Sequence, residues 1–222
     1  MRHAPLTEIE LPSFRSSKVA GRATVRRVSV RSRTGAVVST IPVNMGSYIT
    51  PIMRYAEPPD IYEGNEFTRF ALGRKGNNPF IVFGINPSSA DNVISDRTIN
   101  RIQTFGKTLG FDGWLMLNVY PERSTDPELL KSEMDDELHW KNMECIARVL
   151  KEIEHPILCA AWGININVRP YLKACLRNIA ESLPHATWKS IGVRTIEGHP
   201  RHPLYLPADS VLIDFDIPEY IA

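Results

Sequence analysis

Hydrophobic and polar positions alternate in blocks from Phe67 onward, and the blocks differ in length. Short apolar runs bounded by turn residues have the length of buried strands, and they occupy residues 80–85, 114–119, 156–162 and 188–193. Between them, apolar residues recur every three or four positions, which predicts helices over residues 96–110, 135–154 and 166–183. This alternation predicts an α/β fold of three layers (αβα), with a mostly parallel four-stranded sheet between helices. Residues 211–215 are a candidate edge strand.

Residues 1–66 follow a different pattern and are predicted to form a separate N-terminal part. Residues 1–24 are polar and basic, which is typical of an arm. Residues 25–43 are rich in β-branched apolar residues on both sides of a plausible turn at Arg33-Thr34-Gly35, and this pattern predicts a β-hairpin. The expected organisation is an arm and hairpin extension over residues 1–66, followed by an α/β domain over residues 67–222.

Composition and charge narrow the classes of partner. The 222 residues carry a formal net charge of +1, so no overall field draws the chain to nucleic acid or membrane. Residues 1–33 differ, since their eight Lys and Arg against two Glu give 8 − 2 = +6. They form either a solvated tail or a contact for nucleic acid. No apolar run approaches the ~18 residues that span a bilayer, and the N-terminus lacks the apolar centre of a secretory signal. A cytoplasmic location without a membrane partner is expected, and the oligomeric state stays open.

Polar and aromatic residues follow each predicted strand. Because the carboxyl ends of parallel strands meet at one edge of a sheet, these residues are expected to share a cleft there. They are Asn86, Ser88, Ser89 and Asp91 after the first strand, Asn118, Tyr120 and Arg123 around the end of the second, Trp162 at the end of the third, and Arg201 and His202 after the fourth. Arg101, on the first predicted helix, is a further candidate ligand for phosphate.

The chemistry of this set suits a ligand that has a planar ring and an anionic group. The two asparagines can donate and accept hydrogen bonds, which suits a nucleobase edge or a positioned water. The Trp and Tyr rings offer stacking surfaces. The serines and the free amides at the start of the helix after Asp96 suit an anion, and the arginines suit phosphate. His202 can stabilise a leaving group through a hydrogen bond or proton transfer.

Several of these residues have a structural alternative. Asn86 belongs to an Asn-Pro-Ser segment of a type that commonly forms turns. Asp96 is either a helix cap or a catalytic acid, and Trp162 either stacks on a ligand or closes the core. Arg123 is able to pair with Asp126 across its own loop.

No metal or cofactor is expected. His199 and His202 are separated by two residues. Their Pro-rich segment is not a helix face that would aim both side chains at one ion. His199 is interpreted as an exposed loop residue. Asp91, like Asp96, is left with two interpretations, as a cap or as a catalytic acid.

Five segments resemble one family. "NPSSAD", "SDRTINR", "NVYPERSTDP", "AAWG" and "GHPRHPLYLP" are similar, in this order, to the motifs of the bacterial and phage family called domain of unknown function 1643. The resemblance covers about residues 67–207. The family name implies no activity.

A more distant resemblance is to the uracil-DNA glycosylase superfamily. "GINPSS" (84–89) resembles a motif of its mismatch-specific branch, in which the asparagine positions a water beside the sugar; Asn86 is the matching residue. "HPLY" (202–205) resembles a segment whose histidine contacts the base, and His202 matches it. The resemblance implies a uracil-DNA glycosylase-like four-stranded parallel sheet between helices. Ser88 stands where the motif has glycine, and the stacking phenylalanine and DNA-intercalating segment have no obvious counterparts.

Three functional hypotheses follow. The first is a nucleobase glycosylase-like hydrolase that acts on an N-glycosidic bond in DNA or a nucleotide, with Asn86 orienting water and His202 stabilising the departing base. The second is a non-catalytic module that binds a nucleotide or nucleic acid in the same cleft. The third is an interaction protein whose basic residues 1–33 contact RNA, DNA or an acidic partner. The first is preferred narrowly over the second.

Overall fold

The computed structural model describes residues 25–31, 37–44, 53–55 and 57–222. The chain divides into two compact units, Met1–Pro51 and Ile52–Ala222. In the first unit, β1 (Val25–Arg31) and β2 (Val37–Asn44) pair antiparallel, as the predicted hairpin requires. The predicted turn at Arg33-Thr34-Gly35 and the predicted arm lie outside the described residues.

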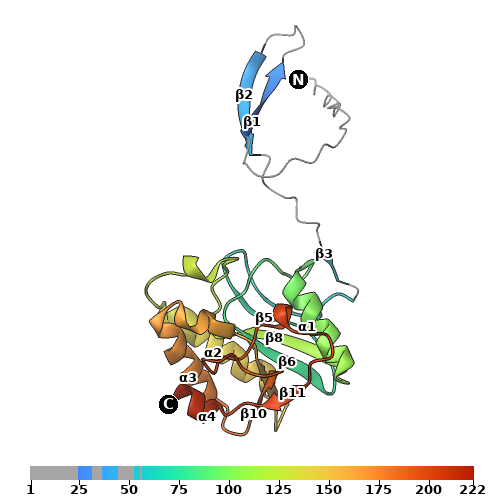
Figure 1. Ribbon diagram of the computed structural model, residues 1–222, viewed down its shortest axis with the longest axis vertical. Helices are drawn as coiled ribbons and strands as arrows, with labels where there is room; N and C mark the ends of the chain where they lie inside the picture. Colours follow the sequence, from blue (N-terminus) through green and yellow to red (C-terminus); the bar gives the residue numbers. More distant parts are fainter. Residues whose placement is uncertain (1–24, 32–36, 45–52, 56) are drawn as a thin grey trace, which may run out of the picture. The chain divides into compact units, whose positions relative to one another are not determined.

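The second unit is built around one mixed sheet of seven strands (Figure 1). In spatial order these are β11 (Leu212–Asp214), β10 (Thr187–Ile191), β9 (Ile157–Ala160), β6 (Pro79–Gly84), β8 (Gly113–Asn118), β5 (Arg69–Arg74) and β4 (Ile61–Gly64). The four central strands, β10, β9, β6 and β8, run parallel to one another. β11, β5 and β4 add antiparallel pairs at the two edges.

The predicted sheet of four strands is therefore too small. The four apolar runs are the four central strands, because burial on both faces selects continuous apolar sequence. The edge strands carry weaker patterns, and β4 belongs to residues that were assigned to the N-terminal extension. The predicted edge strand at residues 211–215 is confirmed as β11. A short pair, β3 (Met53–Arg54) with β7 (Ile94–Ser95), lies outside the main sheet.

Four α-helices lie in the described part of the second unit. They are α1 (Arg97–Thr108), α2 (Asp136–Leu150), α3 (Pro170–Ser182) and α4 (Ile217–Ile221). The Asp96 and Asp135 side chains cap α1 and α2 by accepting from backbone N–H groups at the third position. The third helix was expected from Ile166, but residues Gly163–Asn167 form a 3₁₀ turn (η2) and α3 begins at Pro170. Proline favours the first helical turn, so it sets this start. None of the helices in this part of the chain has the length and apolarity to cross a bilayer.

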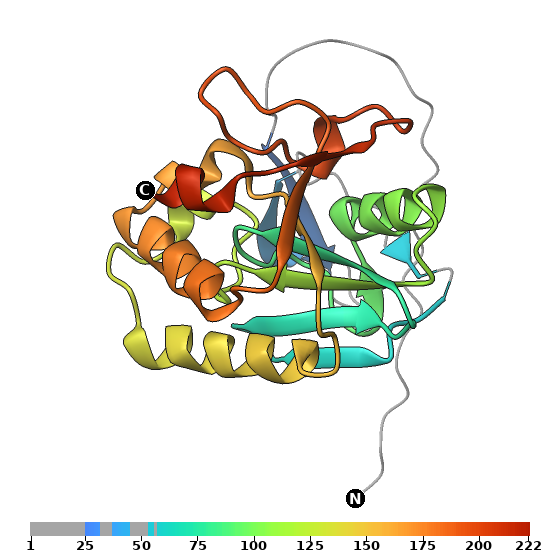
Figure 2. The same cartoon turned by 90° about the horizontal axis from the view of Figure 1, so that it is seen from below.

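Two hydrophobic clusters cover the two faces of the sheet. On β6, Ile81 and Phe83 pack in the cluster that includes α2 and α3, whereas Phe80 and Val82 pack in the cluster that includes α1. Figures 1 and 2 show α1 and the α2–α3 pair on opposite sides of the strands. Alternate side chains of a strand point to opposite faces, so a continuous apolar strand serves both layers. The carboxyl ends of the central strands are left for the loops that carry the candidate residues.

Candidate functional site

A polar cavity of about 240 Å³ lies where the central strands end. It is called the Asn86 cavity below. Its wall comes from the end of β6, the loop that follows, the first turn of α1, the loop after β8, η2 and the 3₁₀ turn η3 (Pro203–Tyr205). The polar side chains in this wall are Arg69, Asn86, Ser88, Asp96, Thr98, Ser124, Thr125, Asn165 and His202. The structure thus brings Asn86, Ser88 and His202 into one site.

A second cavity adjoins the first. It has a volume of about 460 Å³ and is called the Tyr205 cavity below. Asn165 and His202 line both cavities, so the two form one cleft with these residues at the junction. Gly163 brings η2 to this point, because its φ of +64° lies in the left-handed region and a Cβ there would be 3.8 Å from Cβ of His202.

The amide of Asn86 is fixed by the loop around it. Nδ2 donates to the backbone oxygens of Ser124 at 2.9 Å, Pro87 at 3.1 Å and Glu122 at 3.4 Å. Three carbonyl oxygens around one end of the amide require the NH₂ group there. The other end, Oδ1, is therefore the group that remains to accept a hydrogen bond from a water or ligand in the cavity. The turn interpretation and the functional one both fit this residue.

His202 presents one defined tautomer when neutral. The N–H of Leu204 donates to Nδ1 at 3.4 Å, so the ring proton belongs on Nε2. Burial lowers the pKa of His202 below its ordinary value of 6.5, and the charge of Asp96 acts in the opposite direction. At neutral pH the ring is thus an uncharged donor through Nε2.

Asp96 has two functions in the geometry. Its Oδ1 accepts from the N–H of Ile99 at 2.8 Å, which confirms the cap interpretation. The same side chain lines the Asn86 cavity, and its charge raises the pKa of both His202 and Arg69. The second carboxylate oxygen is the part that is not used by the cap.

Arg69 is a cavity residue that sequence reasoning missed. It begins β5, is 2% exposed, and donates through Nη1 to the oxygen of Ala90 at 2.9 Å. Its buried Nε has no partner among the described residues. Burial lowers the pKa of Arg69 to about 10, the charge of Asp96 opposes this shift, and that of Arg123 adds to it. The available signal was an arginine at the start of a segment, "RFALGR", whose other positions are mostly apolar.

Three of the predicted ligand residues have fully buried side chains, which favours the structural interpretation of each. Trp162 is 0% exposed and packs against Trp188 and Phe215, and its Nε1 donates to the hydroxyl of Tyr220 at 3.1 Å. It backs the Tyr205 cavity without offering a stacking face, which is the core alternative. Tyr120 and Asn118 are also 0% exposed.

Tyr120 and Asn118 make their contacts with other residues inside the fold. The hydroxyl of Tyr120 accepts from the N–H of Asp135 at 2.9 Å, and its ring lies against Tyr171. The backbone oxygen of Asn118 accepts from Asn142 at 2.9 Å. An exposed ring for stacking is instead supplied by Tyr205, which is 82% exposed and was not selected from the sequence.

The predicted arginine ligands separate into structural and exposed groups. Arg123 donates to backbone oxygens of Asn65, Thr68, Ser88 and Ala90 and to the hydroxyl of Tyr62, so it holds loops together and lines neither cavity. The alternative pairing with Asp126 is not among the ion pairs of the described residues. Arg101 donates to the oxygens of Pro203 and Leu206 and lies over the Phe105 ring. Arg201 is exposed, lines the Tyr205 cavity and donates to Val193.

The remaining candidates shape loops. The carboxylate of Asp91 accepts from the N–H groups of Val93 and Ile94, both at 2.7 Å, so it caps the backbone that follows it. Ser89 is exposed and lines neither cavity. In the described chain, no group of three or more His, Cys, Asp or Glu side chains gathers as metal ligands would.

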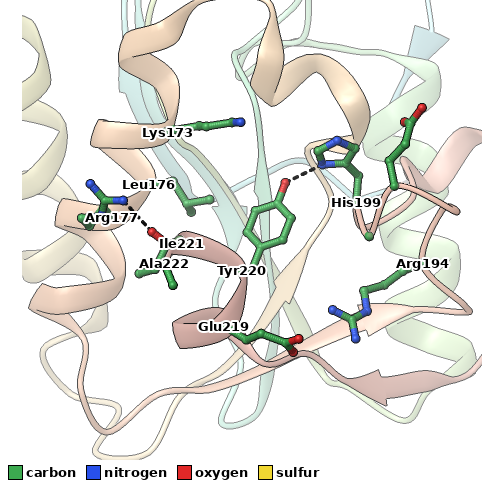
Figure 3. A pocket seen from close by; sticks show the side chains of 11 residues that line it. Lys173, Leu176, Arg177, Arg194, His199, Glu219, Tyr220, Ile221 and Ala222 are labelled. Carbon is green, nitrogen blue, oxygen red and sulfur yellow. Dashed lines mark hydrogen bonds between the residues drawn. The ribbon is translucent and has the colours of Figure 1, made fainter.

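His199 is not an exposed loop residue as expected. It is 8% exposed, and its Nδ1 lies 2.7 Å from the hydroxyl of Tyr220 (Figure 3). Its Nε2 lies 3.1 Å from Nδ2 of Asn167. It faces a third cavity of about 440 Å³, which Lys173 and Arg194 also line. Burial lowers its pKa, as for His202. The two histidines of "HPRH" therefore serve different parts of the molecule.

The fold and the cleft define a mixed α/β protein with a polar site at the carboxyl ends of its parallel strands. Residues 69–204 match the family described as "Protein of unknown function (DUF1643)". This match covers more than half of the chain, and the chain belongs to that family. Every residue that lines the Asn86 cavity lies within the match. No curated protein and no solved structure matches the chain.

Proposed function

We propose that the protein hydrolyses the N-glycosidic bond of a nucleotide or of a related compound that carries a nucleobase. One observation carries this proposal: Asn86 and His202, which are far apart in the sequence, line one cavity together with Asp96. A fixed amide oxygen, a neutral imidazole donor and a carboxylate are the groups that such a hydrolysis requires.

Each group has a defined part in the reaction. Oδ1 of Asn86 accepts a hydrogen bond from a water and aims its lone pair at the anomeric carbon. The water's oxygen forms the new C–O bond, and its proton passes to the free carboxylate oxygen of Asp96. The C–N bond breaks, its electron pair goes to the base nitrogen, and Nε2–H of His202 stabilises the developing negative charge. This leaves the sugar with a new hydroxyl at its anomeric carbon, the base as an anion and the water's proton on Asp96. Transfer of that proton from Asp96 to the base gives the neutral free base and restores the carboxylate, so atoms and charge balance.

The distant sequence resemblance supports the same roles. In the uracil-DNA glycosylase superfamily the residue that matches Asn86 positions water, and the residue that matches His202 contacts the base. Four parallel strands at the centre of the sheet are compatible with this comparison, since the chain segments after β6 and β10 carry Asn86 and His202. A DNA substrate remains part of this proposal alongside a free nucleotide.

A non-catalytic nucleotide-binding module is the alternative. This alternative is favoured because both side chains already have structural contacts. Nδ2 of Asn86 binds a loop oxygen, and Oδ1 of Asp96 caps the helix α1. Under this alternative the same residues build a binding site and no step of chemistry follows.

The test is a screen for release of free base by the full chain. Nucleosides, nucleotides and oligonucleotides with modified or mismatched bases are incubated with the protein, and the base is quantified by chromatography. Turnover is expected to fall about 100-fold or more in Asn86→Ala and in His202→Ala. Ser89→Ala, an exposed neighbour outside both cavities, is the matched control and keeps the activity.

Two results would decide against hydrolysis. Undiminished turnover in both variants would remove these residues from the chemistry. A compound that binds tightly but is recovered intact from every incubation would assign the cleft to the binding module instead.

A further inference from the structure

Arg69 lacks the counter-charge that a buried guanidinium normally has. The group carries five N–H donors, and one of them has an acceptor among the described contacts, the oxygen of Ala90. The residue is 2% exposed and belongs to no described ion pair. A buried charge is costly unless it is paired and hydrogen-bonded. Because Arg69 lines the Asn86 cavity, an anion in that cavity would supply what is missing.

The surrounding wall has the other groups that bind phosphate. Four hydroxyl side chains line the same cavity: Ser88, Thr98, Ser124 and Thr125. The first turn of the twelve-residue helix α1 also lies there, and its Asp96 cap takes up the N–H of Ile99 but not those of the two preceding residues. Helix N-termini favour anions through free N–H groups and positive potential. The charge of Arg123 adds to the positive potential at Arg69, while Asp96 opposes it.

The Tyr205 cavity has a different character that suits a base. The Tyr205 ring is 82% exposed, and Ile164 beside the same cavity is 54% exposed. An exposed aromatic ring and an apolar side chain offer stacking and contact to a planar ring. At about 460 Å³ this cavity is also the larger of the two, and the 240 Å³ of the Asn86 cavity suits a sugar phosphate.

The junction of the cavities is the place for the glycosidic bond. His202 and Asn165 line both sides, so a ligand with its phosphate near Arg69 and its base at Tyr205 has its sugar–base bond beside His202. The anion-binding groups are gathered in one cavity, whereas a polynucleotide is held by phosphate contacts repeated along its length. The overall charge of +1 likewise offers no attraction for a long polyanion.

We propose that the ligand of this cleft is a nucleoside 5′-monophosphate, with its phosphate held by Arg69 and the hydroxyls of the Asn86 cavity and its base in the Tyr205 cavity. This inference rests on the proposed function for the site and names its substrate class. Arg69 is the residue that distinguishes a monophosphate from the corresponding nucleoside.

Calorimetric titration of the full chain tests this without requiring turnover. The probes are the common nucleoside 5′-monophosphates, the corresponding nucleosides, and ribose 5-phosphate. For at least one base, the monophosphate is expected to bind about tenfold or more tightly than its nucleoside, which is the effect of one charge-assisted hydrogen bond. Ribose 5-phosphate is expected to displace it.

In Arg69→Gln, the affinity for the monophosphate is expected to fall to that for the corresponding nucleoside. The matched control is Arg74→Gln, at the other end of the same strand, where the arginine pairs with Glu57 and lines neither cavity. It keeps the tenfold ratio. Circular dichroism and a melting curve establish that both variants fold.

The outcomes separate the two proposals. Equal binding of monophosphate and nucleoside, or a ratio that Arg69→Gln leaves unchanged, would overturn the phosphate site while leaving nucleoside hydrolysis open. Phosphate-dependent binding without base release would support the site and overturn the hydrolase. If Arg69→Gln does not fold, the competition with wild-type protein decides: failure of ribose 5-phosphate to displace any bound monophosphate would sink the inference.

Discussion

At the scale of single residues, Asn86 has a structural role that suits the chemistry proposed for it. Its NH₂ group joins the loop after β6 to the loop after β8 through the oxygens of Glu122 and Ser124. Its remaining oxygen is then held still. A side chain that is immobilised in this way loses little entropy when it orders a water, which is the property that a catalytic or binding site needs.

Substitutions of Asn86 test how much its NH₂ group contributes to the stability of the fold. Asn86→Ala loses the donors to the three carbonyls and is expected to lower the free energy of unfolding by about 1–3 kcal/mol. Asn86→Asp is expected to cost more, because a carboxylate would face the same three oxygens. Urea unfolding of both variants measures the order, with Ser89→Ala as the control. Equal stability of the Ala and Asp variants would show that the amide does not hold the loops.

The candidate site was predictable from the sequence in part. The ends of parallel strands share an edge, so the rule that grouped Asn86, Ser88 and His202 uses topology alone. It does not say which way a side chain points. Trp162 turns into the core, and Arg123 turns back onto carbonyl oxygens of its own loops, since an arginine fork with several acceptors nearby satisfies itself. Arg69 escaped notice because an isolated arginine before an apolar run is usually exposed.

At the scale of elements, Arg101 joins α1 to the segment that carries His202. Its guanidinium donates to the backbone oxygens of Pro203 and Leu206, at the two ends of η3. The cation also covers the Phe105 ring at 4.6 Å from its centroid. The position of His202 in the cleft thus depends on a helix that lies a hundred residues earlier in the chain.

Arg101→Ala is therefore expected to release η3 from α1. Backbone amides of residues 204–206 should exchange hydrogen at least several-fold faster, while those of β6 keep their protection. Hydrogen exchange read by mass spectrometry measures both. Lys107→Ala, in the last turn of the same helix, is the control, because Lys107 is exposed and makes no described side-chain contact with η3. Unchanged exchange at η3 in Arg101→Ala would show that the loop is held by its own packing.

The elements themselves were predictable where the pattern is strong. The cap at Asp96, the helix that starts near Asp135 and the four central strands follow from local sequence. The number of strands does not, because an antiparallel edge strand such as β5 needs a partner before its burial is defined. The helix α3 starts at Pro170 and not at Ile166, because proline favours the first helical turn. Ile166 is still buried, but it belongs to a 3₁₀ turn.

At the scale of the whole molecule, three histidines whose pKa is lowered link stability to pH. Burial lowers the pKa of His139, His199 and His202. A histidine whose pKa is lower in the folded state than its ordinary 6.5 favours folding above pH 6.5. That contribution is lost as the pH falls below 6.5 towards the lowered value, because the unfolded chain then binds more protons.

His139 is the clearest test of this link. It is 1% exposed on α2, and Nδ2 of Asn178 on α3 donates to its Nε2 at 3.0 Å, so protonation breaks a contact between the two helices. The free energy of unfolding is expected to decrease between pH 7.5 and 5.5, and less steeply in His139→Gln. Urea titrations at the two pH values measure the difference. Identical pH dependence in variant and wild type would assign the effect to other groups.

The second of the two compact units can also be tested by itself. Both cavities are lined by residues of the second unit, and so are both hydrophobic clusters. A chain that begins at Ile52 is therefore expected to unfold cooperatively and to bind the same nucleotides with unchanged affinity. Residues 1–33, with their charge of +6, are the proposed source of any affinity for DNA or RNA, and that affinity should fall steeply with salt and disappear with the deletion.

Calorimetry with a nucleotide and a gel-shift assay with an oligonucleotide, each on the full and the shortened chain, measure these two effects independently. Loss of nucleotide affinity on deletion would mean that the first unit completes the cleft. Nucleic-acid affinity that survives the deletion would rule out the basic residues as its source and move it to the α/β unit, where the polyanion would have to be bound by the exposed arginines around the cleft, such as Arg201.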